Sequence, residues 1–110
     1  MRIRRVAALA ISLTAALSSF PGWAQTPLQQ RGGVLARGMC SGCHAIGRTG
    51  DSPLAAAPRF RSLGDQIDFG KLARRLREGL LTGHQDMPMF RFNREDAEAM
   101  VAYLRTLQDR

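Results

Sequence analysis

Apolar residues recur at helical spacing in three stretches of the chain. In the clearest stretch, near the C-terminus, they share one face of a predicted helix: Ala97, Met100, Val101, Leu104 and Leu107. Asn93 is a suitable N-cap for this helix, and the acidic Glu95 and Asp96 suit the positive end of its dipole. We expect the helix to end near Gln108.

The other two stretches predict a middle helix and an N-terminal helix. The middle helix has its apolar face at Phe69, Leu72, Ala73, Leu76 and Leu80. Asp68 would cap its start, and Gly79 or Gly83 would lie near its end. The N-terminal helix, of about three turns, has its stripe at Leu28, Leu35, Ala36 and Met39, although two adjacent glycines lower its helix propensity.

The rest of the chain completes an all-α prediction. Gly and Pro recur from Gly47 to Gly64, which predicts irregular chain over that range. No stretch keeps the alternation of apolar and polar residues that a β-strand needs. The sequence therefore predicts three main helices, with a long loop that needs something to wrap around.

The first 24 residues have the pattern of a secretory signal peptide. A basic start with Arg2, Arg4 and Arg5 precedes an apolar run from Val6 to Leu17, and small residues occupy Gly22 and Ala24 before the expected cleavage site. An uncleaved anchor is the alternative, but the run is shorter than the roughly 20 apolar residues of a spanning helix. We expect export to the periplasm, cleavage after about Ala24, and a mature domain of residues 25–110 without a membrane span.

Length and charge limit what this domain can be. A chain of 110 residues holds at most one small domain. Removing residues 1–24 removes three of the 16 basic residues and none of the nine acidic ones, which leaves a net charge of +4. The arginines are scattered among acids in an exported chain, so we expect a solvated basic surface and no nucleic-acid partner.

The strongest chemical signal is the run Cys40-Ser41-Gly42-Cys43-His44. This C-x-x-C-H pattern is the attachment motif of a c-type haem. One helical turn between the cysteines puts both sulfurs on one side, where they can form thioethers with the haem vinyl groups, and His44 then faces the iron as proximal ligand. The motif predicts one covalently bound haem c. A core this small also benefits from a buried cofactor.

Three other uses of the cysteines are weaker. A disulfide would close a very short loop and constrain the unfolded chain little. A redox-active dithiol normally follows a β-strand, and no strand pattern precedes Cys40. A zinc site could use Cys40 and Cys43 with His44 or His84 as further ligands, but the adjacent Cys43 and His44 are awkward for tetrahedral geometry.

An electron carrier needs a sixth iron ligand, and the segment from Gly83 to Phe90 offers three candidates. These are His84, Met87 and Met89, in a stretch that Pro88 keeps from being regular helix. A methionine thioether would raise the reduction potential, whereas His84 would give bis-histidine ligation and a lower potential.

With these residues the chain resembles the class I monohaem cytochromes c over nearly all of the mature sequence. Gly32 and Tyr103 look like the family's contact between its first and last helices. Pro58 falls where the family has a proline whose carbonyl accepts a hydrogen bond from the proximal histidine. Met87, followed by Pro88, resembles the axial methionine. The chain departs from the family at Ala36, where a bulky aromatic is common.

The resemblance implies three helices and loops wrapped around one haem, and a role in electron transfer. The apolar residues expected around the haem are Leu54, Phe60, Leu63, Leu72, Leu76, Phe90 and Met100. The arginines that could pair with its propionates are Arg48, Arg59, Arg61 and Arg91, although scattered arginines usually face solvent.

With both axial positions filled, we expect an electron carrier and not an enzyme. Its partners would be redox proteins, such as a dehydrogenase, reductase or oxidase, met through small, brief contacts, and we expect the carrier to be a monomer. The alternative is a haem enzyme subunit or gas-binding sensor with an open distal site. The ligands available from His84 to Met89 count against it, and no acid–base group of the kind a peroxidase needs is evident.

Overall fold

The computed structural model describes residues 24–79 and 86–108. Within them the elements follow the order α1 (Pro27–Met39), η1 (Phe60–Asp65), α2 (Phe69–Glu78) and α3 (Arg94–Leu107), where η1 is a 3-10 helix. No strand occurs among these residues, so the all-α prediction is confirmed. The predicted signal peptide, except Ala24, lies outside the described residues, as do Leu80, Gly83 and His84.

Helix α1 begins with caps that the sequence patterns above did not single out. The Thr26 hydroxyl accepts a hydrogen bond from the Gln29 backbone N–H, and the Gln29 side chain accepts one from the Thr26 N–H, a capping box that satisfies two free donors. Pro27 occupies the first helical position, where no N–H is needed. These local bonds offset the low helix propensity of the glycine pair.

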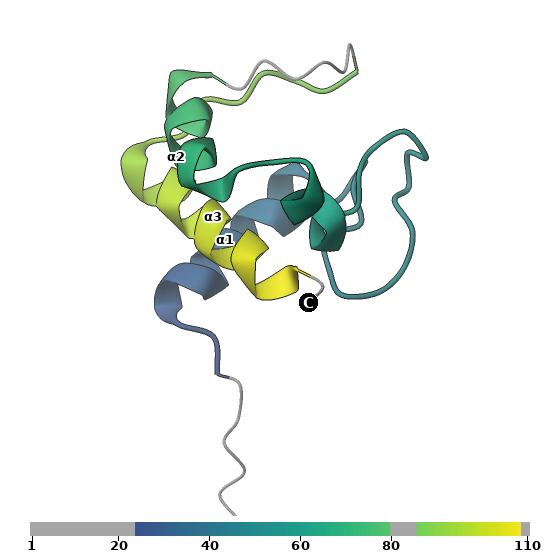
Figure 1. Ribbon diagram of the computed structural model, residues 1–110, viewed down its shortest axis with the longest axis horizontal. Coiled ribbons are helices and arrows are strands. Elements are labelled where there is room, and N and C mark those ends of the chain that lie inside the picture. Colours follow the sequence, from purple (N-terminus) through teal and green to yellow (C-terminus); the bar gives the residue numbers. More distant parts are fainter. Residues whose placement is uncertain (1–23, 80–85, 109–110) are drawn as a thin grey trace, which may run out of the picture.

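The expected apolar face of α1 is confirmed at Ala36, which is buried, and at Leu35, which packs against the core, but the two end residues are exposed. Leu28 and Met39 are 39% and 41% exposed. The buried residues of α1 are Gly32, Gly33 and Ala36. Small residues make this face because α3 crosses α1 there (Figure 1), and two helices approach closely only where side chains are short.

Gly32 marks the tightest point of this crossing. A Cβ atom placed on Gly32 would collide with the Ala99 carbonyl oxygen and lie 2.6 Å from the Tyr103 Cβ. Ala36, one turn later, is fully buried and belongs to the same hydrophobic core as Tyr103. The predicted contact between Gly32 and Tyr103 is therefore present, and the small Ala36 fits the same close crossing.

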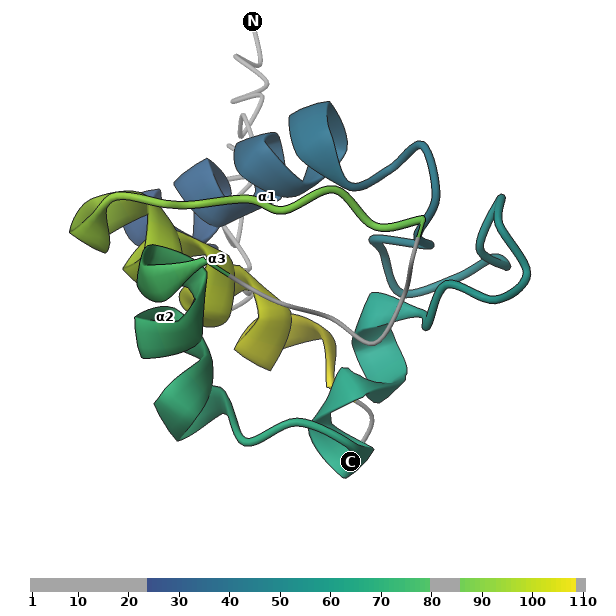
Figure 2. The ribbon, with the colours of Figure 1, turned by 90° about the horizontal axis from the view of Figure 1, so that it is seen from above.

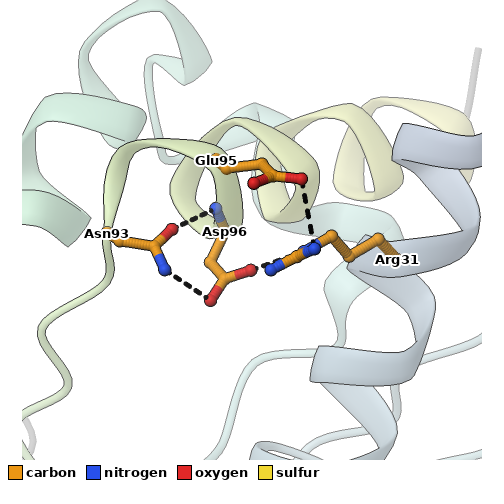
Figure 3. Close-up of polar contacts among 4 residues, drawn as sticks. All are labelled: Arg31, Asn93, Glu95 and Asp96. Carbon is orange, nitrogen blue, oxygen red and sulfur yellow. Dashed lines mark hydrogen bonds and ion pairs between the residues drawn. The ribbon is translucent and has the colours of Figure 1, made fainter.

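A charged cluster also joins the two helices on one side of the crossing (Figure 3). Arg31 of α1 donates to Asp96 over 2.6 Å and to Glu95 over 3.1 Å, both in the first turn of α3. Asn93 caps α3 by accepting from the Asp96 N–H, and its side-chain amide donates to the Asp96 carboxylate. The cation of one helix thereby meets acids placed at the positive end of the other helix's dipole.

The other two elements pack on α3. Helix α2 begins at its predicted cap, where the Asp68 carboxylate accepts from the Gly70 N–H, and ends at Gly79, whose φ of 101° suits glycine. The prediction of irregular chain over 47–64 is confirmed for residues 47–59 and corrected for residues 60–64, which belong to the short helix η1. The Gln108 side chain fastens η1 to the end of α3 through the Phe60 carbonyl and the Gly64 N–H.

The predicted inner face of α3 is confirmed, since all five of its residues are buried. The core they form with neighbouring elements also includes Phe60, Leu63, Leu72, Leu76, Phe92 and Tyr103. No helix among the described residues has the length and apolar character needed to cross a membrane.

Candidate functional site

The turn that follows α1 carries the C-x-x-C-H run. Cys40 is the C-cap of α1, and its N–H donates to the Ala36 carbonyl. The Cys40 carbonyl in turn accepts from the N–H of Cys43 over 3.2 Å and from that of His44 over 2.9 Å. These bonds continue the helix by one tight turn, which fixes the cysteines and the histidine relative to one another.

The His44 ring is held from two sides. Its Nδ1 atom lies 2.7 Å from the Pro58 carbonyl oxygen. A carbonyl can only accept, so Nδ1 carries the proton and donates it, which leaves the lone pair of Nε2 free for a metal. The Phe60 ring lies 5.1 Å from the imidazole, centroid to centroid, and is itself buried.

Backbone bonds explain why Pro58 lies in this place. The Phe60 N–H donates to the Ala45 carbonyl and the Leu54 N–H donates to the Cys43 carbonyl. The Ala45 N–H also donates to the Ser52 hydroxyl. These hydrogen bonds hold the loop of residues 51–59 against the turn that carries His44. As a consequence, the Pro58 carbonyl faces the His44 ring.

The opposite side of the site comes from the segment before α3, residues 86–92. It runs from the side of the molecule that holds the loop of residues 51–59 to the start of α3 (Figure 2). The Phe92 N–H donates to the Leu76 carbonyl over 2.9 Å, and the buried Phe92 ring lies 6.2 Å from that of Phe90. This anchor on α2 sets the position of the residues that precede it.

These segments meet at one pocket. Its lining includes Cys40, Cys43, His44 and Met87, together with Met39, Leu54, Ala56, Ala57, Asp86, Pro88 and Phe90. Met87 is half-buried, whereas Met89 is 62% exposed and does not line the pocket. The thioether that the sequence favoured therefore lies with the two thiols and the imidazole. His84 lies outside the described residues.

The pocket wall differs in part from the predicted one. Of the seven apolar residues expected there, Leu54 and Phe90 line the pocket. Phe60 does not line it but packs against the ring of His44, which does. The others pack in the helical core: Leu63, Leu72, Leu76 and Met100. Helical periodicity located buried residues without distinguishing core from pocket. The small Ala56 and Ala57 were missed, although the apolar run before Pro58 in a loop was a usable signal.

None of the four arginines considered for the propionates lines the pocket. Arg48 donates to the Thr106 carbonyl over 2.7 Å, and Arg59 lies 3.4 Å from the Asp51 carboxylate. Arg91 is exposed, and one buried nitrogen of the Arg61 side chain has no hydrogen-bond partner among the described residues.

The electrostatics of the cysteines do not favour dithiol chemistry. Burial raises the pKa of the Cys40 thiol to about 11, and the neighbouring Cys43 contributes in the same direction. A reactive dithiol needs a thiol whose pKa is lowered. Among the residues that the structure describes, no three His, Cys, Asp or Glu side chains gather as a metal-ion site.

A comparison with protein-family models decides the family. The model described as Cytochrome c matches residues 29–108, which include both cysteines, His44, Pro58 and Met87. The chain belongs to the cytochrome c family. Neither the search of curated proteins nor that of solved structures gave a match.

Members of the cytochrome c family carry a covalent haem c with its iron, and they are electron carriers. The residues of this cytochrome c fit that group. Two thiols, an imidazole with Nε2 free and a thioether line one pocket, and most of the other lining side chains are apolar. This donor set matches thioether attachment and His/Met ligation.

Proposed function

We propose that this cytochrome c is an exported one-electron carrier with His/Met ligation. Cys40 and Cys43 would form the thioethers, His44 would be the proximal iron ligand and Met87 the distal one. When bound, the haem accepts and releases one electron by cycling between ferric and ferrous iron. The observation that carries the proposal is that all four side chains line one pocket.

The surroundings of His44 support its role. Donation from Nδ1 to the Pro58 carbonyl fixes the tautomer that a ligand through Nε2 requires, and it increases the electron density on the ring. The Phe60 ring limits rotation of the imidazole. Pro58 is therefore proposed to orient and tune the proximal ligand.

The position of Met87 favours a carrier over an enzyme or a gas sensor. A sensor needs a distal position that a small molecule can occupy, whereas Met87 lines the pocket that holds His44. The neighbouring Met89 is mostly exposed. A soft thioether on the distal side favours ferrous iron and raises the potential.

We also propose that residues 1–24 direct export to the periplasm and are cleaved, and that residues 25–110 act there as a monomer. The basic and apolar runs of the first 24 residues support export. Covalent attachment suits a carrier that diffuses outside the cytoplasm, because the haem cannot be lost between encounters.

The test is to express the full chain in a host with haem-maturation machinery and to record spectra of the oxidised and reduced protein. Haem that resists acid-acetone extraction, a low-spin reduced spectrum and a weak near-infrared sulfur-to-iron band are expected. High-spin haem that binds carbon monoxide readily would contradict the carrier. Haem that the acid-acetone removes would contradict the covalent attachment.

A further inference from the structure

The side chain of Gln108, the C-cap residue of α3, connects the end of this helix to η1 (Figure 1). Its Nε2 atom donates to the Leu104 carbonyl over 2.6 Å and to the Phe60 carbonyl over 2.9 Å. Its Oε1 atom accepts from the Gly64 N–H over 2.7 Å. Two carbonyls on one side and an N–H on the other leave one orientation of the amide that satisfies all three bonds.

Gly64 leaves the room that this amide occupies. A Cβ atom on Gly64 would lie 2.8 Å from the Oε1 atom of Gln108 and 3.4 Å from its Cδ atom. The φ of Gly64 is not positive, so the backbone itself does not require a glycine at this position. The missing side chain of Gly64 therefore serves the contact with Gln108.

Phe60 links this contact to the proximal histidine. Its carbonyl accepts from Gln108, and its N–H donates to the Ala45 carbonyl over 2.9 Å. Its ring lies 5.1 Å from the ring of His44. Two residues earlier is Pro58, whose carbonyl accepts from Nδ1 of His44. A displacement of Phe60 would therefore disturb both groups that hold the imidazole.

Helix α3 also holds the segment that follows His44. The Tyr103 hydroxyl donates to the Ile46 carbonyl over 2.6 Å, and the Arg48 guanidinium donates to the Thr106 carbonyl over 2.7 Å. Both segments of the proximal contact are thus attached to the last turns of α3.

We infer that Gln108 is a positioning residue for the proximal iron ligand. By holding the Phe60 carbonyl, it keeps the Pro58 carbonyl within hydrogen-bond distance of Nδ1 of His44. That hydrogen bond increases the electron density on the imidazole and favours ferric iron, so loosening it would raise the potential. The inference rests on the proposed electron-carrier function, because Gln108 acts here through His44 as iron ligand.

The test compares Gln108→Ala with Gln66→Ala in the reduced, ¹⁵N-labelled holoprotein. Gln66 is the matched control because it is an exposed glutamine at the C-cap of η1. In Gln108→Ala the Nδ1 proton of His44 should exchange with solvent at least about fivefold faster, the effect of one lost hydrogen bond, and the potential should rise. Gln66→Ala should change the exchange rate less than about twofold and keep the parent's potential.

Two further variants separate the sides of the amide. Gln108→Glu keeps an acceptor for the Gly64 N–H but loses the donor to the Phe60 carbonyl, so it should behave like Gln108→Ala. Gly64→Ala displaces the amide from the other side and should also speed the exchange and raise the potential. It takes the place of the variants at position 108 if these do not mature.

Denaturant titrations give the free energy of unfolding of each variant. If exchange rises no more than the loss of global stability explains and the potential stays at the parent's value, Gln108 only stabilises the fold, and the inference is overturned. Equal effects in Gln108→Ala and Gln66→Ala overturn it as well. A parent without low-spin haem and the sulfur-to-iron band contradicts the carrier itself, whereas a normal parent with unaltered variants contradicts only the role of Gln108.

Discussion

The Nδ1 atom of His44 donates a hydrogen bond to the Pro58 carbonyl oxygen, 2.7 Å away. Fourteen residues separate the two along the chain, and backbone bonds between their segments hold them together. This contact makes one tautomer of the imidazole the stable one, with Nε2 available to the iron.

The first prediction concerns the proton on Nδ1 of His44. In the reduced holoprotein the Nδ1 proton of His44 should exchange slowly with solvent and give a resolved NMR signal, because it is hydrogen-bonded in a half-buried site. Long-range ¹H–¹⁵N spectra measure this directly. A His44 ring protonated at Nε2 and not at Nδ1 would contradict the proposed ligation.

Gly32→Ala tests the crossing of α1 and α3. The new methyl group would collide with the Ala99 carbonyl and approach the Tyr103 Cβ, so a loss of about 2 to 3 kcal/mol in the free energy of unfolding is expected. Gly38→Ala is the matched control in the same helix, since a Cβ there meets no atom of the described residues within 4 Å. The control should gain roughly 0.5 to 1 kcal/mol from helix propensity. Denaturant titrations of the two variants measure these changes in the free energy of unfolding. Equal changes in the two variants would show that the crossing tolerates a side chain at position 32.

The burial of Tyr103 predicts that the protein becomes less stable at alkaline pH. Its hydroxyl donates to the Ile46 carbonyl over 2.6 Å, and burial raises its pKa above 10.0, against a smaller opposing effect of Arg37 and Arg48. Above about pH 10 the unfolded state releases this proton before the folded state does. The free energy of unfolding therefore falls as the pH rises from there.

Tyr103→Phe should lose about 1 kcal/mol at neutral pH and decline less steeply than the parent above pH 10. Denaturant titrations at several pH values measure both effects. An equally steep decline in the variant would assign the alkaline loss to another group.

Arg31→Gln tests the cluster in Figure 3. The pKa of Arg31 is raised by its hydrogen bond and charge contact with Asp96, with a further contribution from Glu95. The pair is partly exposed, so the loss of stability should be small, clearly below that of Gly32→Ala, and should disappear at about 1 M salt. A loss that salt leaves unchanged would mean that Arg31 acts through packing.

The sequence predicted some elements well for physical reasons. Helix α3 was predicted with its cap and its buried face, because large apolar residues and a strong capping residue coincide there. The buried face of α1 was predicted only in part: Ala36 lay in the expected apolar stripe and the family resemblance placed Gly32 at the helix contact, but a glycine such as Gly33 gives no hydrophobic signal. The short helix η1 depends on contacts with the end of α3, which no local pattern carries.

The site shows the same division. The Cys40–His44 run predicts covalent haem attachment from the sequence alone, because its residues are contiguous. The resemblance favoured Met87 over Met89, and the structure adds a tertiary observation that spacing alone does not reveal, since Met87 lines the pocket with His44 and Met89 does not.

The most direct test compares Met87→Ala with Met89→Ala by near-infrared absorption and voltammetry of the holoprotein. Both variants should keep covalent haem, since neither changes Cys40 or Cys43. Met87→Ala should lose the sulfur-to-iron band and lower the potential by on the order of 0.1 V, whereas Met89→Ala should keep both close to the parent. If Met89→Ala lost the band and Met87→Ala kept it, the assignment of Met87 as distal ligand would be wrong.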